Sequence, residues 1–118
     1  NCIFADAPQA ARIATYDLVI RNCYFQWTGN ELEDAMQILD YDSNYADGAR
    51  LVPQPGNRII LVENCDFVSP NWTGELFQVL DNKVTIVVRN CRINGATSLF
   101  ADQRSGTVTG ELIDGGGN

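Results

Sequence analysis

The segments LVIRNCYF (residues 18–25), ILVENCDF (60–67) and IVVRNCRI (86–93) repeat one pattern of apolar residues around an Asn-Cys dipeptide. The chain opens on the same unit, as NCIF (1–4). The Asn residues of these four Asn-Cys pairs, at positions 1, 22, 64 and 90, are separated by 21, 42 and 26 residues. Recurrence at such a spacing indicates an architecture of stacked repeats.

A fifth, degenerate copy closes the sequence. Aligning VTIVVRNCRI (84–93) on VTGELIDGGG (108–117) places Asp114 at the position of Asn90, a further step of 24 residues. The same alignment places Leu112 at the position of Val88. We therefore expect this segment to form the last strand of the stack.

Apolar residues alternate with polar ones before each Asn, which predicts strands with one buried face. Asn tolerates left-handed backbone angles, so we expect the chain to bend at Asn22, Asn64 and Asn90. A second apolar run follows each unit, in IATYD (13–17), MQILD (36–40), LFQVLD (76–81) and SLFAD (98–102). Each repeat thus contains at least two short strands and no helical crossover, which predicts a β-solenoid.

These units resemble the right-handed parallel β-helix of pectate-lyase-like polysaccharide lyases, phage tailspikes and bacterial surface proteins. The resemblance rests on residues 20–25, 62–67 and 88–93, with partial copies at 1–4 and 112–117. It implies an all-β, single-stranded β-helix of about four to five short coils. It also implies a structural ladder in which Asn22, Asn64 and Asn90 form side-chain amide rows and Cys23, Cys65 and Cys91 point inward. Because such a fold hosts many functions, activity has to be argued from a site.

Composition indicates one exported domain over residues 1–118. The net charge of −7, from 8 Lys and Arg against 15 Asp and Glu, argues against nucleic acid as a partner. No apolar run is long enough for a membrane helix, so we expect no membrane insertion. We expect an extracellular, cell-surface or virion-surface location. The sequence begins inside a repeat unit, so we expect a mature or excised piece of a longer precursor, or a subunit that stacks on a neighbour.

The four cysteines could form disulfides, because their number is even in a short chain. Cys residues in one column of a parallel stack would lie about 4.8 Å apart, one strand spacing. Their side chains would run parallel rather than converge, which favours a row of free thiols over strained disulfides. With no His and no Cys-x-x-Cys spacing, we expect no zinc site, and no other metal or cofactor.

Residues 41–57 form a predicted loop insertion, rich in Pro, Gly, Asn and Asp. The loop is either a tolerated insertion or a place for binding residues. The Trp-Thr-Gly motif occurs at both Trp27 and Trp72. With Tyr24 and Tyr45 these side chains are candidates for a carbohydrate site, although aromatic residues at turns also cover the ends of apolar cores.

Acidic residues end the second run of each repeat, at Asp17, Asp40, Asp81 and Asp102. Aligned acids could bind Ca²⁺, but turn capping by Asp is the favoured interpretation. The outward columns Arg21, Glu63, Arg89 and Tyr24, Asp66, Arg92 alternate in charge, which predicts pairs between strands. We find no acid–base machinery and expect no catalytic residues; an enzyme of this fold would be a polysaccharide lyase or glycoside hydrolase.

An outward-facing apolar column, Val19, Leu61 and Val87, predicts either an interface or a sheet face covered by the loop 41–57. A solenoid also has two open ends, here near Asn1 and Cys2 and near Leu112 and Asp114. We therefore expect self-association as a homo-oligomer or filament, in a non-catalytic structural subunit of an extracellular assembly. The alternative is a carbohydrate-binding or polysaccharide-degrading module of a surface or phage protein, with a glycan as partner.

Overall fold

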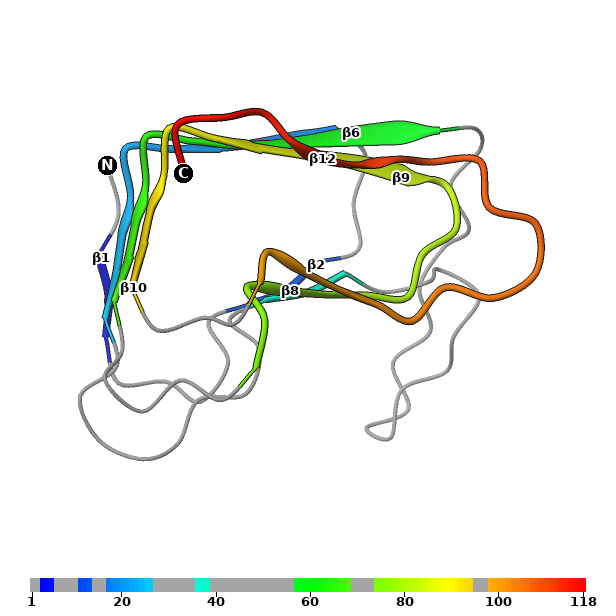
Figure 1. Ribbon diagram of the computed structural model, residues 1–118, viewed down its shortest axis with the longest axis horizontal. Coiled ribbons are helices and arrows are strands. Elements are labelled where there is room, and N and C mark those ends of the chain that lie inside the picture. Colours follow the sequence, from blue (N-terminus) through cyan, green and yellow to red (C-terminus); the bar gives the residue numbers. More distant parts are fainter. Residues whose placement is uncertain are drawn as a thin grey trace.

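The computed structural model describes residues 3–5, 11–13, 17–26, 36–38, 57–68, 74–94 and 98–118 (Figure 1). Side chains are described for 17–26, 57–68, 74–94 and 98–118. The described part of the chain contains twelve short strands and no helix. The predicted all-β class is therefore confirmed. The predicted insertion at 41–57 lies outside the described residues, except for Asn57.

The strands form three four-stranded sheets in which every neighbouring pair is parallel. The first sheet has the order β1 (Ile3–Ala5), β4 (Tyr24–Gln26), β7 (Asp66–Val68), β10 (Arg92–Asn94). The second has the order β2 (Ala11–Ile13), β5 (Met36–Ile38), β8 (Phe77–Val79), β11 (Phe100–Asp102). The third has the order β3 (Leu18–Arg21), β6 (Arg58–Glu63), β9 (Val84–Arg89), β12 (Leu112–Asp114).

The chain visits the three sheets in a fixed order, first, second, third, and does so four times among the described strands. Each such visit is called a pass below. Figure 1 shows successive passes lying over one another, with the third sheet along the top and the first along the left. Residues 20 to 45 positions apart thereby become neighbours, as Leu18 and Ile60 do across β3 and β6.

The observed register confirms the predicted columns over three passes. Leu18 pairs with Ile60, which pairs with Ile86, and Phe25 pairs with Phe67, which pairs with Ile93. Each pass contains three strands, one more than the minimum expected, because the chain is extended again after each Cys. In the predicted run 13–17, only Ile13 belongs to a described strand.

The bends between the third and first sheets occur at the predicted residues. Asn22, Asn64 and Asn90 have φ values of 55°, 54° and 52°, in the left-handed region that Asn tolerates. The backbone N–H groups of Asn22 and Asn64 donate to the carbonyls of Glu63 and Arg89 in the next pass, at 3.3 Å each. In the described part of the chain this ladder is made by the backbone, and no amide-to-amide bond joins the three Asn side chains.

A single core lies between the sheets and is built from the inward columns. Its fully buried side chains are mostly aromatic or aliphatic. The rings of Phe25 and Phe67 stack with centroids 4.5 Å apart and planes 9° from parallel. Stacking of this kind adds about 0.5–1.5 kcal/mol to the stabilisation from burial alone. The repeated sequence pattern is therefore also the packing pattern.

The predicted alignment of the last repeat is wrong by two residues. β12 pairs Leu112 with Ile86 and Asp114 with Val88, which is a step of 26 residues and not 24. Gly116 then takes the bend position of Asn90, with a φ of 90°. Asp resembles Asn chemically, but the bend requires a left-handed backbone, and Gly adopts one without steric cost.

Candidate functional site

The fourth pass leaves one end of the stack without a further layer among the described residues. Its strands β10, β11 and β12 are each an edge strand of their sheet. The apolar residues of this pass are only half buried, although they pack against the core: Ile93, Leu99, Phe100 and Leu112. An end of this kind combines accessible strand edges with accessible core side chains.

The side chain of Asn118 covers one corner of this end. Its Oδ1 accepts a hydrogen bond from the Cys91 N–H at 3.0 Å, and its Nδ2 donates to the Val88 carbonyl at 2.8 Å. Nδ2 also donates to Oδ1 of Asp114 at 2.7 Å. Asp114 stands in register above Val88 and is exposed, so polar groups replace the apolar column at this corner. The more open part of the end lies over the first and second sheets.

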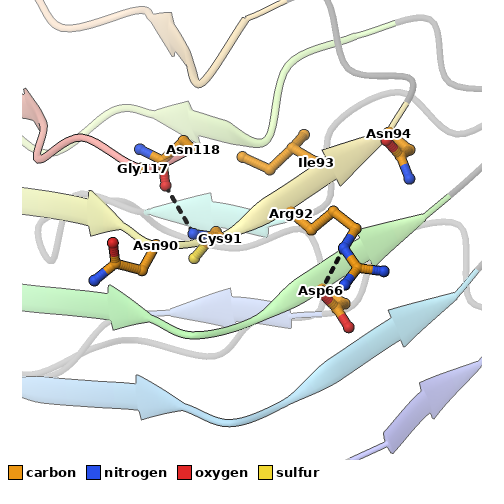
Figure 2. Close-up of a pocket in the computed structure, with 8 residues that line it drawn as sticks. All are labelled: Asp66, Asn90, Cys91, Arg92, Ile93, Asn94, Gly117 and Asn118. Carbon is orange, nitrogen blue, oxygen red and sulfur yellow. Dashed lines mark hydrogen bonds and ion pairs between the residues drawn. The ribbon is translucent and has the colours of Figure 1, made fainter.

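A pocket of about 470 Å³ opens beside this corner (Figure 2). It is lined mainly by polar residues, together with Cys91 and the apolar Ile93. The lining residues come from β7, the Asn90 bend, β10 and the C-terminal residues: Asp66, Asn90, Cys91, Arg92, Ile93, Asn94, Gly117 and Asn118. Figure 2 shows Arg92 directed toward Asp66, and Nε of Arg92 lies 3.6 Å from Oδ1 of Asp66. The pocket contains both signs of charge, which suits hydrogen bonding more than binding of a strongly charged ligand.

Three buried cysteines form one column that ends at this pocket. None of Cys23, Cys65 and Cys91 forms a disulfide, as expected. The sulfur of each lies 3.3 Å from the carbonyl oxygen two residues earlier, so all three have the same local conformation. The thiols of Cys65 and Cys91 are neighbours in the column, and their interaction raises the pKa of Cys65 and lowers the pKa of Cys91. The pair therefore loses its first proton more readily than its second.

Outward charges pair between passes as predicted. Glu63 lies between two arginines, with its carboxylate 3.1 Å from Arg21 and 2.7 Å from Arg89. Both guanidinium groups are about half exposed, so each pair contributes only a few tenths of a kcal/mol to about 1 kcal/mol. This column aligns strands and shows no feature of a catalytic centre.

The column of aspartates serves turns and ion pairs. Oδ1 of Asp81 accepts the N–H of Lys83 at 2.9 Å, and Oδ1 of Asp102 accepts the N–H of Arg104 at 3.1 Å. Asp17 instead accepts the N–H of Ile59 in the next pass, at 2.8 Å. The turn-capping interpretation is confirmed for Asp81 and Asp102, and Asp40 lies outside the described residues. Across the described ranges, no group of three or more His, Cys, Asp or Glu side chains could hold a metal ion.

The outward apolar column is present on the third sheet. Val19 is 52% exposed, and Leu61 and Val87 are half buried beside it. The register adds Ile113, which pairs with Val87, to this column, and Ile59, 54% exposed, lies on the same face. The sequence alignment missed Ile113 because of its two-residue error. Nothing among the described residues indicates what would cover this face.

Of the four residues proposed for a carbohydrate site, only Tyr24 lies among the described residues. Trp27, Trp72 and Tyr45 lie outside the described residues, as do Asn1 and Cys2 of the predicted interface. Tyr24 is half buried on β4, in register with Asp66. Leu112 packs against the core and is half buried, while Asp114 is exposed at the polar corner, and their interface role stays a prediction. The carbohydrate site stays a prediction.

Sequence reasoning missed a buried ion pair. Arg58 begins β6 and pairs with Val84 of β9. Arg58 and Asp81 are each only 3% exposed. The guanidinium of Arg58 pairs with the carboxylate of Asp81. Position 58 is in phase with the inward residues Ile60 and Val62, but an arginine next to the predicted loop was not expected to be buried. Asn118 was also missed, because its role depends on the Gly116 bend.

No helix in the described part of the chain is long and apolar enough to cross a membrane. Among the described residues, the open end of the fourth pass, with its pocket and its column of cysteines, is the strongest candidate for a functional site. Comparisons of the chain with models of known families, with curated proteins and with solved structures give no match.

Proposed function

We propose that this chain is a right-handed parallel β-helix and a non-catalytic structural subunit of an extracellular assembly or filament, in which copies join end to end. Support for the β-helix comes from the cyclic order of the three sheets and the parallel register of every strand pair. The right hand is supported by the strong preference of connections between parallel strands. The extracellular setting follows the resemblance in the Asn-Cys repeat.

The observation that carries the proposed association is the open end of the fourth pass. β10, β11 and β12 all present a free edge among the described strands, and Ile93, Leu99 and Phe100 remain half buried. Free strand edges pair readily with another chain, and half-buried apolar residues gain about 25 cal/mol for each Å² removed from water. A second copy could supply both kinds of contact.

The apolar columns would also continue from one copy into the next across such a contact. In the same register, β1 of a second copy would follow β10, which places Phe4 in the column of Ile93. β3 would follow β12, which places Leu18 in the column of Leu112. Asp114 and Asn118 interrupt the apolar column at one corner, so the contact would centre on β10 and β11. The contact is heterologous, and such contacts produce filaments when they do not close into rings.

The test is the association state of the purified chain at increasing concentration, followed by sedimentation velocity and negative-stain microscopy. The variant Ile93→Lys places a charge at the open end, where burying an unpaired ammonium is costly. We expect it to abolish assemblies while the far-UV circular dichroism stays that of a β protein. The matched control Val19→Lys changes an exposed apolar residue on the third sheet and should assemble normally.

Two results oppose the proposal. A wild-type chain that stays monomeric at high concentration excludes self-association. Assemblies that survive Ile93→Lys but are lost in Val19→Lys indicate contact through the third sheet, not through the ends.

A further inference from the structure

The column of thiols has a spacing that suits one particular kind of ligand. Cys23, Cys65 and Cys91 hold their sulfurs at the same distance, 3.3 Å, from the carbonyl oxygen two residues earlier. The sulfurs of Cys65 and Cys91 also both lie 3.8 Å from a carbonyl oxygen of the pass before, that of Ile20 or Val62. Because conformation and surroundings repeat from pass to pass, the sulfurs repeat at the strand spacing, about 4.8 Å.

That spacing is wrong for a disulfide. A disulfide requires sulfurs about 2.05 Å apart, so two neighbouring thiols would have to approach each other by about 2.7 Å. The Asn bends and the paired strands on both sides of the column hold the backbone in place. Closing the bond would therefore distort two passes of the sheet.

The same spacing suits a single atom placed between two sulfurs. With metal–sulfur bonds of about 2.3 Å, as in zinc thiolates, a linear sulfur–metal–sulfur unit spans about 4.6 Å. Thiolates select soft cations such as Cu(I). Zinc itself wants four ligands, and the chain has no His to complete such a set. A soft d¹⁰ cation that accepts two ligands in a line has no such need.

The pocket supplies a route to the upper pair. Cys91 lines the pocket, and Cys65 lies one pass further from it in the column. Figure 2 shows the sulfur of Cys91 on the side facing the β6–β7 bend, in agreement with its contact to the Val62 carbonyl. The described residues that surround the entrance, Asn90, Asn94 and Asn118 among them, offer oxygen atoms through which a cation could pass.

We propose that Cys65 and Cys91 form a two-coordinate site for a soft monovalent cation of the Cu(I) class. Binding forms two metal–sulfur bonds and breaks two S–H bonds, so that M⁺ and two thiols give an anionic bis-thiolate and two protons. No electron is transferred in this step. The proposal departs from the sequence-based expectation of no metal, which weighed zinc at the cysteines and Ca²⁺ at the aspartates. It does not depend on the proposed association.

The probe is Ag⁺, a soft d¹⁰ ion with no redox chemistry under the assay conditions, added to the reduced protein without oxygen. Cys2→Ser is used as the background in every sample, so that only the described column contributes. Binding is followed by ultraviolet sulfur-to-metal absorbance, by the metal content after desalting, and by competition with a small thiol. We expect one tightly bound ion per chain.

Two further substitutions test the pair. Cys23→Ser leaves Cys65 and Cys91 intact and should keep the tightly bound ion. Cys65→Ser leaves only thiols two strand spacings apart, about 9.6 Å, which a single ion cannot bridge in a line. Its affinity should fall by more than about 100-fold, because one of two thiolates is lost. Cys65→Ala serves as a second variant, with circular dichroism to confirm the fold.

Several outcomes would overturn the site. Equal affinity in the Cys23→Ser and Cys65→Ser proteins shows that single thiols bind the ion independently. More than one tightly bound ion in the Cys23→Ser protein means that the ion is not shared by the pair. Rapid, complete formation of a Cys65–Cys91 disulfide with a mild oxidant such as diamide shows that the sulfurs lie closer than the strand spacing allows.

Discussion

At the scale of single residues, the left-handed Asn at each bend does the most to define the fold. The three described copies share φ values within 3° of one another, from 52° to 55°. A side chain other than Gly, Asn or Asp is disfavoured there, because its Cβ crowds the following carbonyl. This residue type could be read from the sequence, and the structure confirms it at every described bend between β3 and β10.

A pair of substitutions at the second bend tests this role. Asn64→Ala should lower the free energy of unfolding by about 1–2 kcal/mol, the cost of a left-handed backbone for an ordinary residue. Asn64→Gly should change it by less than about 0.5 kcal/mol, since Gly adopts the same angles freely. Urea unfolding measures both. Equal losses in the two variants would mean that the Asn side chain, and not the backbone angle, stabilises the bend.

A second residue-scale prediction concerns Asp102 and pH. The bidentate contact of Arg104 lowers the pKa of Asp102 from 3.8 to about 2. A carboxylate with a lowered pKa in the folded state stabilises the protein fully above its unfolded value. This stabilisation should therefore be present above about pH 4 and be lost as the pH falls toward 2. The side chain is 50% exposed, so the effect should stay below about 1 kcal/mol.

The measurement compares the wild type with Asp102→Asn in urea at several pH values. The difference between their free energies of unfolding should shrink as the pH falls from 5 toward 2. A difference that stays constant over this range would show that the Arg104 contact does not depend on the charge of Asp102.

At the scale of elements, β6 and the turn before β9 are joined by the buried Arg58–Asp81 pair. Removing one member of such a pair leaves the other charge buried without its partner, which costs about 3–5 kcal/mol. Asp81→Asn keeps an oxygen to accept the Lys83 N–H but removes the charge, so we expect a loss in that range.

The double variant Arg58→Met with Asp81→Asn provides the matched control. Replacing a buried ion pair by apolar or neutral groups is often close to neutral, so stability should recover by several kcal/mol relative to Asp81→Asn alone. Thermal and urea unfolding measure this difference. Failure to recover would show that Asp81 acts mainly through the Lys83 turn.

The last strand depends on a close approach of two backbones. Gly110 stands in register with Val84, and a Cβ added at Gly110 would collide with the Val84 carbonyl. Gly110→Ala should therefore loosen β12 from β9, seen as increased hydrogen exchange at the Leu112–Asp114 amides. At Gly116, which has open space and a φ of 90°, Asn should be tolerated as it is at Asn90. Equal exchange in the two variants would contradict this contact.

The last strand also shows where sequence reasoning failed. The register of β3, β6 and β9 could be predicted, because each strand precedes an Asn-Cys pair and alternates strictly. β12 has neither feature, and an alignment by chemical similarity matched Asp114 with Asn90. In the structure the bend is made by Gly116, because the bend requires a left-handed backbone and not an Asn-like side chain. The pocket and the Asn118 corner depend on this register, so they could not be predicted either.

At the scale of the whole molecule, the described strands pair only with strands one pass away. Each pairing closes a loop of about 20 to 45 residues, as from Leu18 to Ile60. Chains dominated by such non-local pairings fold slowly, in milliseconds to seconds. We expect stopped-flow refolding on that timescale. Refolding within microseconds would indicate that local contacts dominate.

The proposed function could be predicted only in outline, because its evidence lies at the ends of the stack. The repeat indicates that ends exist but not what covers them. The structure shows a polar corner at Asp114 and Asn118 beside half-buried Ile93, and a half-buried Phe100 on another sheet at the same end. The carbohydrate alternative depends on Trp27 and Trp72, outside the described residues, and stays a prediction.

The uniformly parallel direction of the strands has a consequence for any filament built in the proposed way. Every subunit would point the same way, so the filament would be polar, with two chemically different tips. The two tips would then elongate at unequal rates, as a seeded growth assay with labelled subunits can show. A subunit blocked only at Ile93 would still add through its other end and would stop growth there, acting as a chain terminator at substoichiometric amounts.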